Sequence, residues 1–352
     1  MFLWSAASAF PARSYSQVDC LQGFEASLRF NDLAPSSQRL LRRVLGGDSG
    51  IKTRRLALTG IEEAFELNPD VLHRRFSEHA PRLAVDAVRR ALSKANLNPD
   101  TLDALVISTC TGYLCPGLTS YVGESLGMAA DAVHLDLVGH GCGAAIPNLR
   151  TAHALIHSGH ARTVMSVCVE VCSAAFYLDD DPGVLISACL FGDAAGAVLC
   201  ASEPPKQSRS VEWITSHSSL QPDKRESLRF EQRNGMLRNI LARETPTIAA
   251  DSAFHDLHHV LADRGLEKEA ITSWITHAGG RRVLEAIAHK LALNRDALSV
   301  SWDLLSQYGN TSSSFVMLGL EKHLELDAPS GHWWMNSFGA GFSSHGILLK
   351  AE

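Results

Sequence analysis

The chain has 352 residues, of which 45% are hydrophobic and 20% charged, and its formal net charge is −6 at pH 7. A chain of this length can bury one large core or two packed halves of ordinary domain size, so its stability requires no disulfide or metal. The acidic balance and the lack of a basic stripe exclude a nucleic-acid-binding protein, because such a protein has to neutralise phosphates.

The cysteines indicate a reducing compartment. Several of the eight lie inside apolar runs rather than in loops, which is typical of reduced thiols in a cytoplasmic protein. The pairs Cys110/Cys115 and Cys168/Cys172 have no partner pair at zinc-site spacing, so no metal is predicted. No run reaches the roughly 18 apolar residues of a membrane span, and the apolar N-terminus lacks the basic region of a secretory signal. We therefore predict a cytoplasmic protein that does not contact a membrane.

Strands and helices alternate along the chain, which predicts an α/β protein with mostly buried strands. In the first half, strand-like runs at 102–109, 133–138, 163–171 and 195–201 alternate with helical patterns at 82–95, 118–127 and 148–158. The polar, proline-containing stretch 202–210 is interpreted as a connection. A similar order then follows, with strands near 213–220, 273–280, 332–339 and 343–351 and helices near 250–264, 281–292 and from about 311. We therefore predict two halves built on one plan, 1–205 and 206–352.

Cys142 stands between the strand-like run at 133–138 and a helix that opens near Gly143. A helix N-terminus favours a thiolate over a thiol, and the flanking glycines let other atoms approach closely. The setting suits a nucleophile. The alternative is a small buried hydrophobe, which is what most cysteines are.

A thiolate that carries an acyl group needs a donor for the developing oxyanion and a group that holds a proton. His277 ends a predicted buried strand, and Asn310 follows a glycine before a helix rich in small residues. Taken singly, these residues are equally well explained as a core histidine and a helix N-cap. Cys142, His277 and Asn310 are each predicted at an equivalent strand-to-helix joint, so in a duplicated α/β fold they would face one crevice.

The segments around these residues resemble the type III polyketide synthases, the chalcone synthase family of the thiolase fold, in their bacterial form. The resemblance runs nearly end to end, and "YGNTSS" and "LFGD" are its more specific parts. The segments that carry it are "GHGCGAA" (139–145), "CLFGDAAGAVL" (189–199), "THAGGRRVLEAI" (276–287), "SQYGNTSSSFVML" (306–318) and "SFGAGF" (337–342).

The resemblance implies two duplicated βαβαβαββ halves that form a five-layer αβαβα core, and a homodimer without a separate cofactor. It implies an acyltransferase that condenses an acyl-CoA starter with malonyl-CoA by decarboxylative Claisen chemistry and cyclises the product, for example to a resorcinol or pyrone. Cys142 would carry the acyl group, and His277 would sustain its thiolate as an ion pair. His277 and Asn310 would donate to the enolate that remains when malonyl loses carbon dioxide.

The resemblance also assigns the walls of a substrate cavity. Phe191 matches a gatekeeper phenylalanine, and Asn239 stands where a second gatekeeper phenylalanine is usual. Cys115 would be offered across the dimer interface, just before a cis bond to Pro116. The other lining residues would be Cys110, Thr111, Cys172, Ala175 and Ser312. Several of these residues are smaller than in the plant enzymes, which predicts a roomy pocket and an aliphatic starter.

Coenzyme A carries phosphates, so the mouth of its tunnel needs cations. The helix near 36–47 supplies Arg39, Arg42 and Arg43 where the family keeps basic residues, although such a face is also common on solvated helices. Gly279 and Gly280 would let the pantetheine arm approach the backbone.

The sequence leaves several other functions open. A ketoacyl synthase III or a hydroxymethylglutaryl-CoA synthase would share the fold but perform one condensation. A non-catalytic acyl-binding protein would not need all three catalytic residues. A papain-like hydrolase also uses Cys, His and Asn, but it does not predict "LFGD" or the duplicated plan.

Overall fold

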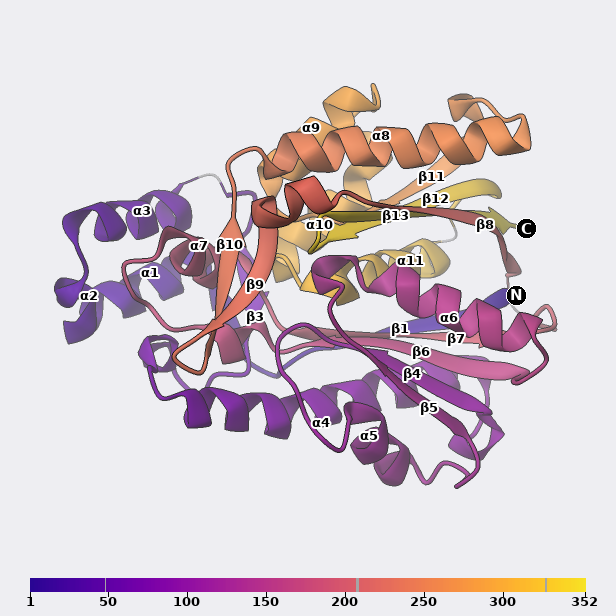
Figure 1. Cartoon of the computed structure of the whole chain (residues 1–352), viewed down its shortest axis with the longest axis horizontal. Coiled ribbons are helices and arrows are strands. Elements are labelled where there is room, and N and C mark those ends of the chain that lie inside the picture. The colour runs from indigo at the N-terminus through magenta and orange to yellow at the C-terminus, as the bar shows by residue number, and fades with distance from the viewer. Residues whose placement is uncertain (48, 207–208, 327) are drawn as a thin grey trace.

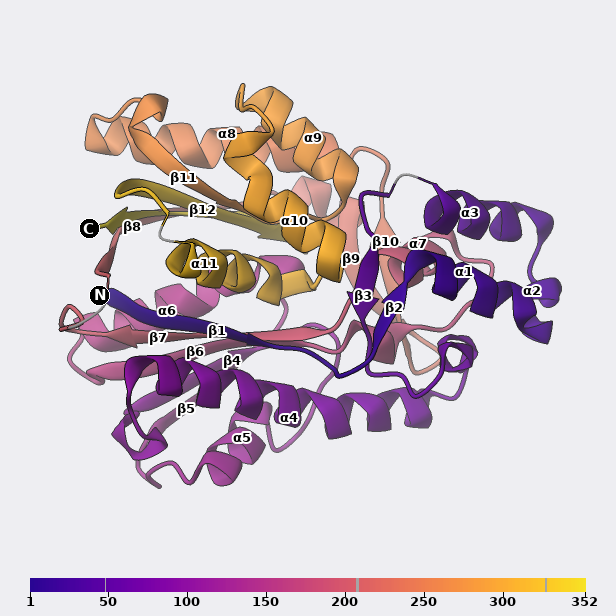
Figure 2. The same cartoon turned by 180° about the vertical axis from the view of Figure 1, so that it is seen from behind.

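Two sheets and three layers of helices are stacked in this protein, and Figures 1 and 2 show the stack from its two sides. The computed structural model describes residues 1–352 with the exception of 48, 207–208 and 327. From one outer face to the other, the helical layers contain α4 (Pro69–Ala95) with α5 (Leu118–Leu126), α6 (Ala145–His157) with α11 (Phe315–Glu325), and α8 (Thr245–Arg264) with α9 (Arg281–Lys290). This is the predicted five-layer αβαβα arrangement.

The strands follow one continuous order across the two sheets. That order is β11 (Ile271–Thr276), β12 (Gly331–Gly339), β13 (Ser343–Ala351), β8 (Val211–Leu220), β1 (Phe2–Ala9), β7 (Ala194–Ala201), β6 (Thr163–Glu170), β4 (Ala104–Ser108) and β5 (Val133–Leu137). The two sheets are joined where Phe2 of β1 pairs with Glu212 of β8. Strand β4 is parallel to β5 and β6, and β11 is parallel to β12, whereas β7 and β13 are antiparallel to their neighbours.

The two halves differ in the interval before their central helices. In the first half β5 separates α5 from α6, but in the described part of the second half helix α10 (Ser299–Tyr308) occupies the interval between α9 and α11, and the second sheet has four strands. The expectation that Asn310 follows a strand is therefore wrong. The predicted division at 205/206 falls in the connection between β7 and β8 and stays a prediction.

Strand β5 is not buried, contrary to the prediction for 133–138. It lies at the edge of the first sheet and pairs with β4 on one side, so its residues alternate between half-buried and exposed. Val138, directly after it, is 60% exposed. The chain thus presents a strand edge on its surface.

A smaller group of elements, which includes α3, lies at one end of the molecule in Figures 1 and 2. Its members are α1 (Gln17–Ala26), α2 (Leu28–Asp32), α3 (Pro35–Gly46), α7 (Pro182–Leu190), the hairpin of β2 (Ser14–Ser16) and β3 (Thr53–Arg55), and the hairpin of β9 (Leu228–Arg233) and β10 (Met236–Leu241). Fully buried Arg54 joins β3 to the end of α7 within this group: its Nη1 donates to the carbonyl oxygens of Ala188 (2.7 Å) and Phe191 (2.8 Å). A cation at a helix C-terminus satisfies free carbonyls, so Arg54 fixes the end of α7.

Helix α11 is buried from Phe315 to Glu321, as expected for a helix between two sheets. The turn before its partner α6 packs backbone against backbone on the end of β12. A Cβ atom at Gly339 would lie 2.1 Å from the carbonyl oxygen of His140 and 2.4 Å from the amide nitrogen of Gly143. Only glycine fits there, and this contact places Cys142.

Gly339→Ala should therefore destabilise the protein by about 1–3 kcal/mol, because the new methyl group meets backbone that cannot swing away. Gly46→Ala, at the end of α3, is the matched control, since its Cβ would lie 3.5 Å from Leu21 Cδ2, which is an ordinary contact. Urea unfolding measures both free energies. Equal values for the two variants would contradict this account of the close packing.

Candidate active site

Cys142 lies in the 3-10 helix η3 (Gly141–Gly143), and α6 follows from Ala145, so the predicted strand, turn and helix are confirmed. The turn is possible because Gly139 (φ 91°) and Gly141 (φ 57°) adopt left-handed backbone conformations. Cys142 is 7% exposed, and its Sγ accepts a hydrogen bond from Ser312 Oγ at 3.2 Å.

Ser312 connects several parts of the site. It begins the 3-10 helix η8 (Ser312–Ser314) and has a left-handed backbone (φ 55°), which is unusual for a residue other than glycine. Besides Cys142, its Oγ contacts Cys110 Sγ at 3.2 Å and Glu170 Oε1 at 3.4 Å. Its backbone N–H donates to Asn310 Oδ1 at 2.8 Å. One strained residue thus joins the nucleophile to Asn310.

Asn310 lies between α10 and η8. Its backbone N–H donates to the carbonyl oxygen of Leu190 (2.9 Å) and its carbonyl accepts from Gly192 N–H (3.0 Å), so the residues around Phe191 pair with it as a short bridge. Its Nδ2 donates to the carbonyl oxygen of Gly279 at 3.2 Å. Asn310 therefore reaches the segment that carries His277.

His277 directly follows β11 and is 1% exposed. Its ring meets Phe315 and Phe338 edge to face, at centroid distances of 5.5 Å and 5.0 Å. Within the described part of the chain neither ring nitrogen has a hydrogen-bond partner. Burial lowers the pKa of His277 to about 3. Taken singly, the imidazole is thus neutral, and both of its nitrogens are buried without a partner.

Burial raises the pKa of Cys142 to about 12; nearby Glu170 adds to the rise, and the hydrogen bond from Ser312 opposes it. The expectation of a thiolate at this helix N-terminus is therefore not met by Cys142 alone, because the loss of hydration outweighs the favourable contacts. His277 is not among the groups that set this pKa.

Glu170 is a buried carboxylate at the site that the sequence analysis did not identify. It ends β6, is fully buried, and accepts hydrogen bonds from Cys110 N–H (3.0 Å), Thr111 Oγ1 (2.9 Å) and Ser313 Oγ. Burial raises its pKa. The signal was present, because an acidic residue closes the otherwise apolar run "TVMSVCVEV".

Most of the predicted cavity residues surround this cluster. Thr111 and Cys172 are 4% and 3% exposed, and Ala175 ends the 3-10 helix η4 (Cys172–Ala175) that begins at Cys172. Phe191 is half-buried beside Asn310. Cys115 lies on the surface, and its bond to Pro116 is cis, as predicted.

The predicted coenzyme A residues form two groups. Arg42 is paired with Glu25 (2.6 Å) and lies over the ring of Phe30, whereas Arg39 and Arg43 are exposed and have no charged partner in the described residues. Gly279 lies against the Phe338 ring, and Gly280 (φ 156°) caps the N-terminus of α9. The tunnel-mouth assignment stays a prediction.

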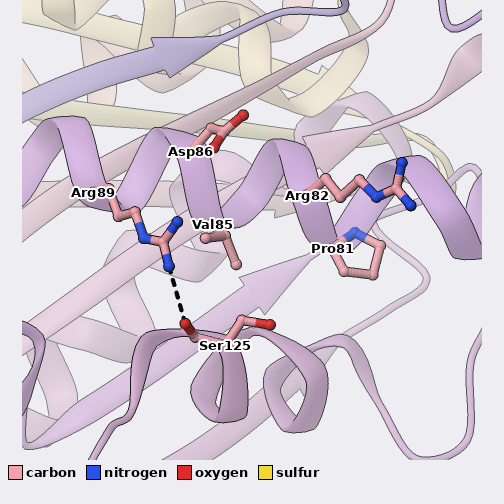
Figure 3. Close-up of a pocket in the computed structure, with 6 residues that line it drawn as sticks. All are labelled: Pro81, Arg82, Val85, Asp86, Arg89 and Ser125. Atoms are coloured by element: carbon pink, nitrogen blue, oxygen red, sulfur yellow. Dashed lines mark hydrogen bonds between the residues drawn. The ribbon is translucent and has the colours of Figure 1, made fainter.

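A separate surface groove of about 410 Å³ lies between α4 and α5 (Figure 3), where Arg89 Nη2 donates to the carbonyl oxygen of Ser125 at 3.1 Å. None of the predicted site residues lines it. The described chain holds no group of three or more His, Cys, Asp or Glu side chains suited to a metal ion. Among the same residues, no helix has the length and apolarity that a membrane span requires.

With this geometry in place, comparison with known proteins decides the family. The family model described as FAE1/Type III polyketide synthase-like protein matches residues 8–220. The chain belongs to the type III polyketide synthases. The C-terminal model of 3-oxoacyl-[acyl-carrier-protein] synthase III matches residues 261–351. The chain is thus an enzyme of the acyltransferase class, as the sequence resemblance implied.

Three relatives show how far the similarity of this type III polyketide synthase extends. The 1,3,6,8-tetrahydroxynaphthalene synthase of Streptomyces peucetius is 30% identical over 97% of this chain and 91% of its own. The "Alpha-pyrone synthesis polyketide synthase-like Pks18" of Mycobacterium tuberculosis is 26% identical over 90% of this chain and 84% of its own. The structure also superposes on the crystal structure of PKS-I from the brown alga Ectocarpus siliculosus, with a TM-score of 0.91 and 25% sequence identity. The superposition covers 99% of this chain and 98% of the PKS-I chain. The thiolase-like fold is thereby confirmed.

In this synthase, His277→Gln should leave Cys142 with the pKa of about 12 that burial and its other contacts produce without the imidazole. In the parent, a thiolate paired with the imidazolium would have a lower pKa, because each charge offsets the other's lost hydration. Since only the thiolate is alkylated, the rate of iodoacetamide attack in the variant should still be rising at about pH 10, whereas in the parent it should already have levelled off. Intact-mass analysis follows the rates. Identical pH profiles would show that His277 does not sustain the thiolate.

Proposed function

We propose that the enzyme condenses an acyl-CoA starter with malonyl-CoA units by decarboxylative Claisen chemistry and closes the product into a pyrone or resorcinol. The observation that carries this proposal is the unbroken series of contacts from Cys142 through Ser312 and Asn310 to Gly279, two residues after His277. These contacts support the roles of Cys142 as nucleophile and of His277 and Asn310 as donors. The chemistry needs no separate cofactor, because loss of carbon dioxide from malonyl generates the carbon nucleophile.

In the loading step, Cys142 Sγ attacks the thioester carbon of the starter. The new bond joins Sγ to the acyl carbon, the bond to the coenzyme A sulfur breaks, and the thiol proton passes to coenzyme A. His277 suits the transfer of that proton, because both its nitrogens are unpaired and one of them can hold it.

In the extension step, malonyl-CoA loses carbon dioxide and leaves an enolate whose negative charge rests on the thioester oxygen. His277 and Asn310 would donate to that oxygen. The Asn310 amide has two N–H groups, and the contact with Gly279 at 3.2 Å uses one of them. The enolate carbon then attacks the acyl group on Cys142, and the carbon–sulfur bond breaks.

Asn310→Ala should slow release of carbon dioxide from malonyl-CoA by about 10²–10³-fold, the usual effect of losing one oxyanion donor. Trapping of the released gas measures the rate. Cys142→Ala is the control, because it removes the nucleophile and keeps both donors, so it should retain part of the decarboxylation. An Asn310→Ala enzyme that decarboxylates at the parental rate would remove Asn310 from this role.

The starter is proposed to be aliphatic. Ala175, Cys110 and Cys172 are small, and the relatives named for α-pyrone and tetrahydroxynaphthalene synthesis support a ring-forming polyketide product. Mass spectrometry of the products from malonyl-CoA with short, long and aromatic acyl-CoA starters tests this. A single condensation on an acyl-carrier protein would favour the ketoacyl synthase III alternative, which the match at residues 261–351 keeps open.

A homodimer in the cytoplasm completes the proposal. Strand β5 has an open edge and is followed by Val138, which is 60% exposed. Exposed Cys115 precedes the cis bond, and Thr119, four residues after Cys115, donates its backbone N–H to Asp136 of β5. A second copy that pairs along this edge would cover Val138 and receive Cys115. All eight cysteines are free thiols, which supports a reducing compartment.

A further inference from the structure

The junction between β10 and α7 holds an unpaired polar group close to the catalytic cluster. Asn239 of β10 is 3% exposed, and its Nδ2 donates to Ser187 Oγ of α7 at 2.8 Å. Ser187 lies one helical turn before Phe191, whose N–H donates to the Ser187 carbonyl (2.9 Å). Phe191 in turn pairs with Asn310. Strand β10 also contacts η4, which carries Cys172 and Ala175.

The hydrogen bonds at this junction fix the orientation of the Asn239 amide. Ser187 has one hydroxyl hydrogen, and it is donated to the carbonyl oxygen of Gly183 at 2.8 Å. Ser187 Oγ must therefore accept from Asn239, which places Nδ2 on the serine and leaves Oδ1 as the free end. Among the described residues no donor reaches Asn239 Oδ1.

A buried acceptor without a donor lowers the stability of the free protein, and buried polar groups are nearly always paired. Such atoms recur around the catalytic residues, where both nitrogens of His277, Thr311 Oγ1 and Asn336 Nδ2 are also buried and unpaired. The backbone carbonyl oxygen of Asn336 accepts a hydrogen bond from the backbone N–H of His277. Asn239 thus shares with His277 a buried polar atom that has no partner among the described residues of the free protein.

We propose that Asn239 is a substrate-binding residue whose Oδ1 accepts a hydrogen bond from an N–H or O–H donor of the bound thioester. The inference rests on the proposed function, because coenzyme A thioesters supply such donors in two places: the amide N–H and hydroxyl groups of the pantetheine arm, and a hydroxyl group on the acyl chain. A purely apolar acyl chain cannot satisfy this oxygen. Asn239 would thus select for a substrate that carries a hydrogen-bond donor, rather than only enlarge the cavity.

A structural role makes the opposite predictions about stability. If Asn239 only held β10 to α7, its removal would weaken folding and leave binding unchanged. If Oδ1 serves the substrate, Asn239→Leu keeps the volume and removes an unsatisfied acceptor, while Ser187 Oγ keeps its bond to Gly183. The unfolding midpoint should then hold or rise while substrate affinity falls.

The test measures binding by calorimetry in the Cys142→Ala background, where no acyl transfer occurs. The probes are butyryl-CoA, 3-hydroxybutyryl-CoA and the butyryl thioester of N-acetylcysteamine. Asn239→Leu and Asn239→Ala should both weaken binding by about 2–10-fold, the range of one hydrogen bond. Equal weakening for both CoA thioesters would place the donor on the pantetheine arm, and weakening confined to the hydroxylated probe would identify the acyl hydroxyl. Weakening that extends to the truncated thioester would identify its single amide as the donor.

Ser187→Ala is the matched control, since it breaks the same junction but keeps Oδ1, and it should bind within about twofold of the parent. Unchanged affinity in both Asn239 variants, or loss of folding in both, would overturn the inference. Failure of the parent to bind any of the CoA thioesters would instead contradict the proposed function.

Discussion

The hydroxyl group of Ser312 is the point on which the site depends. It contacts Cys142, Cys110 and Glu170, and the same residue's N–H holds Asn310. Its left-handed backbone costs ~1–3 kcal/mol in such a position. That cost is sustained because α11, which follows directly, is buried between two sheets and cannot shift without disturbing both.

Two other constraints keep the reacting groups in register with Ser312. The nucleophile turn lies so close to Gly339 that no side chain fits between them, which fixes Cys142 from the other side. Arg54, buried at the end of α7, holds the carbonyl of Phe191 and so fixes the segment that pairs with Asn310. The assembled site is therefore buried and held from both sides. Burial raises the pKa of Cys142 and lowers the pKa of His277, because it disfavours each charge alone. The thiol and the imidazole are therefore expected to ionise together as a pair rather than singly.

The sequence predicted most of the fold because the buried strands and amphipathic helices follow their ordinary periods. It failed where tertiary context decides. The interval before Asn310 gave no strand signal and forms α10. The exposure of β5 has a different origin, because the alternation in "VHLDLV" is itself typical of a half-exposed strand and already predicts it.

The proposed catalytic residues Cys142, His277 and Asn310 could be named from their surroundings and the resemblance, and hydrogen bonds join the three segments that carry them. Full burial of Arg54 could not be foreseen, because arginine is seldom buried without partners and these are backbone carbonyls distant in sequence. The direction of the Cys142 pKa likewise depends on the depth of burial, which no local pattern contains. Asn239 was expected from the family alignment, but its unpaired oxygen is visible only once Ser187 and Gly183 are in place.

The central claim is that Cys142 carries the acyl group during catalysis. Incubation of the enzyme with an acyl-CoA starter, followed by intact-mass and peptide analysis, tests this most directly. The account predicts one acyl adduct on the peptide that contains Cys142, and no adduct in Cys142→Ala. An adduct that persists in Cys142→Ala, or that maps to another cysteine, would contradict it.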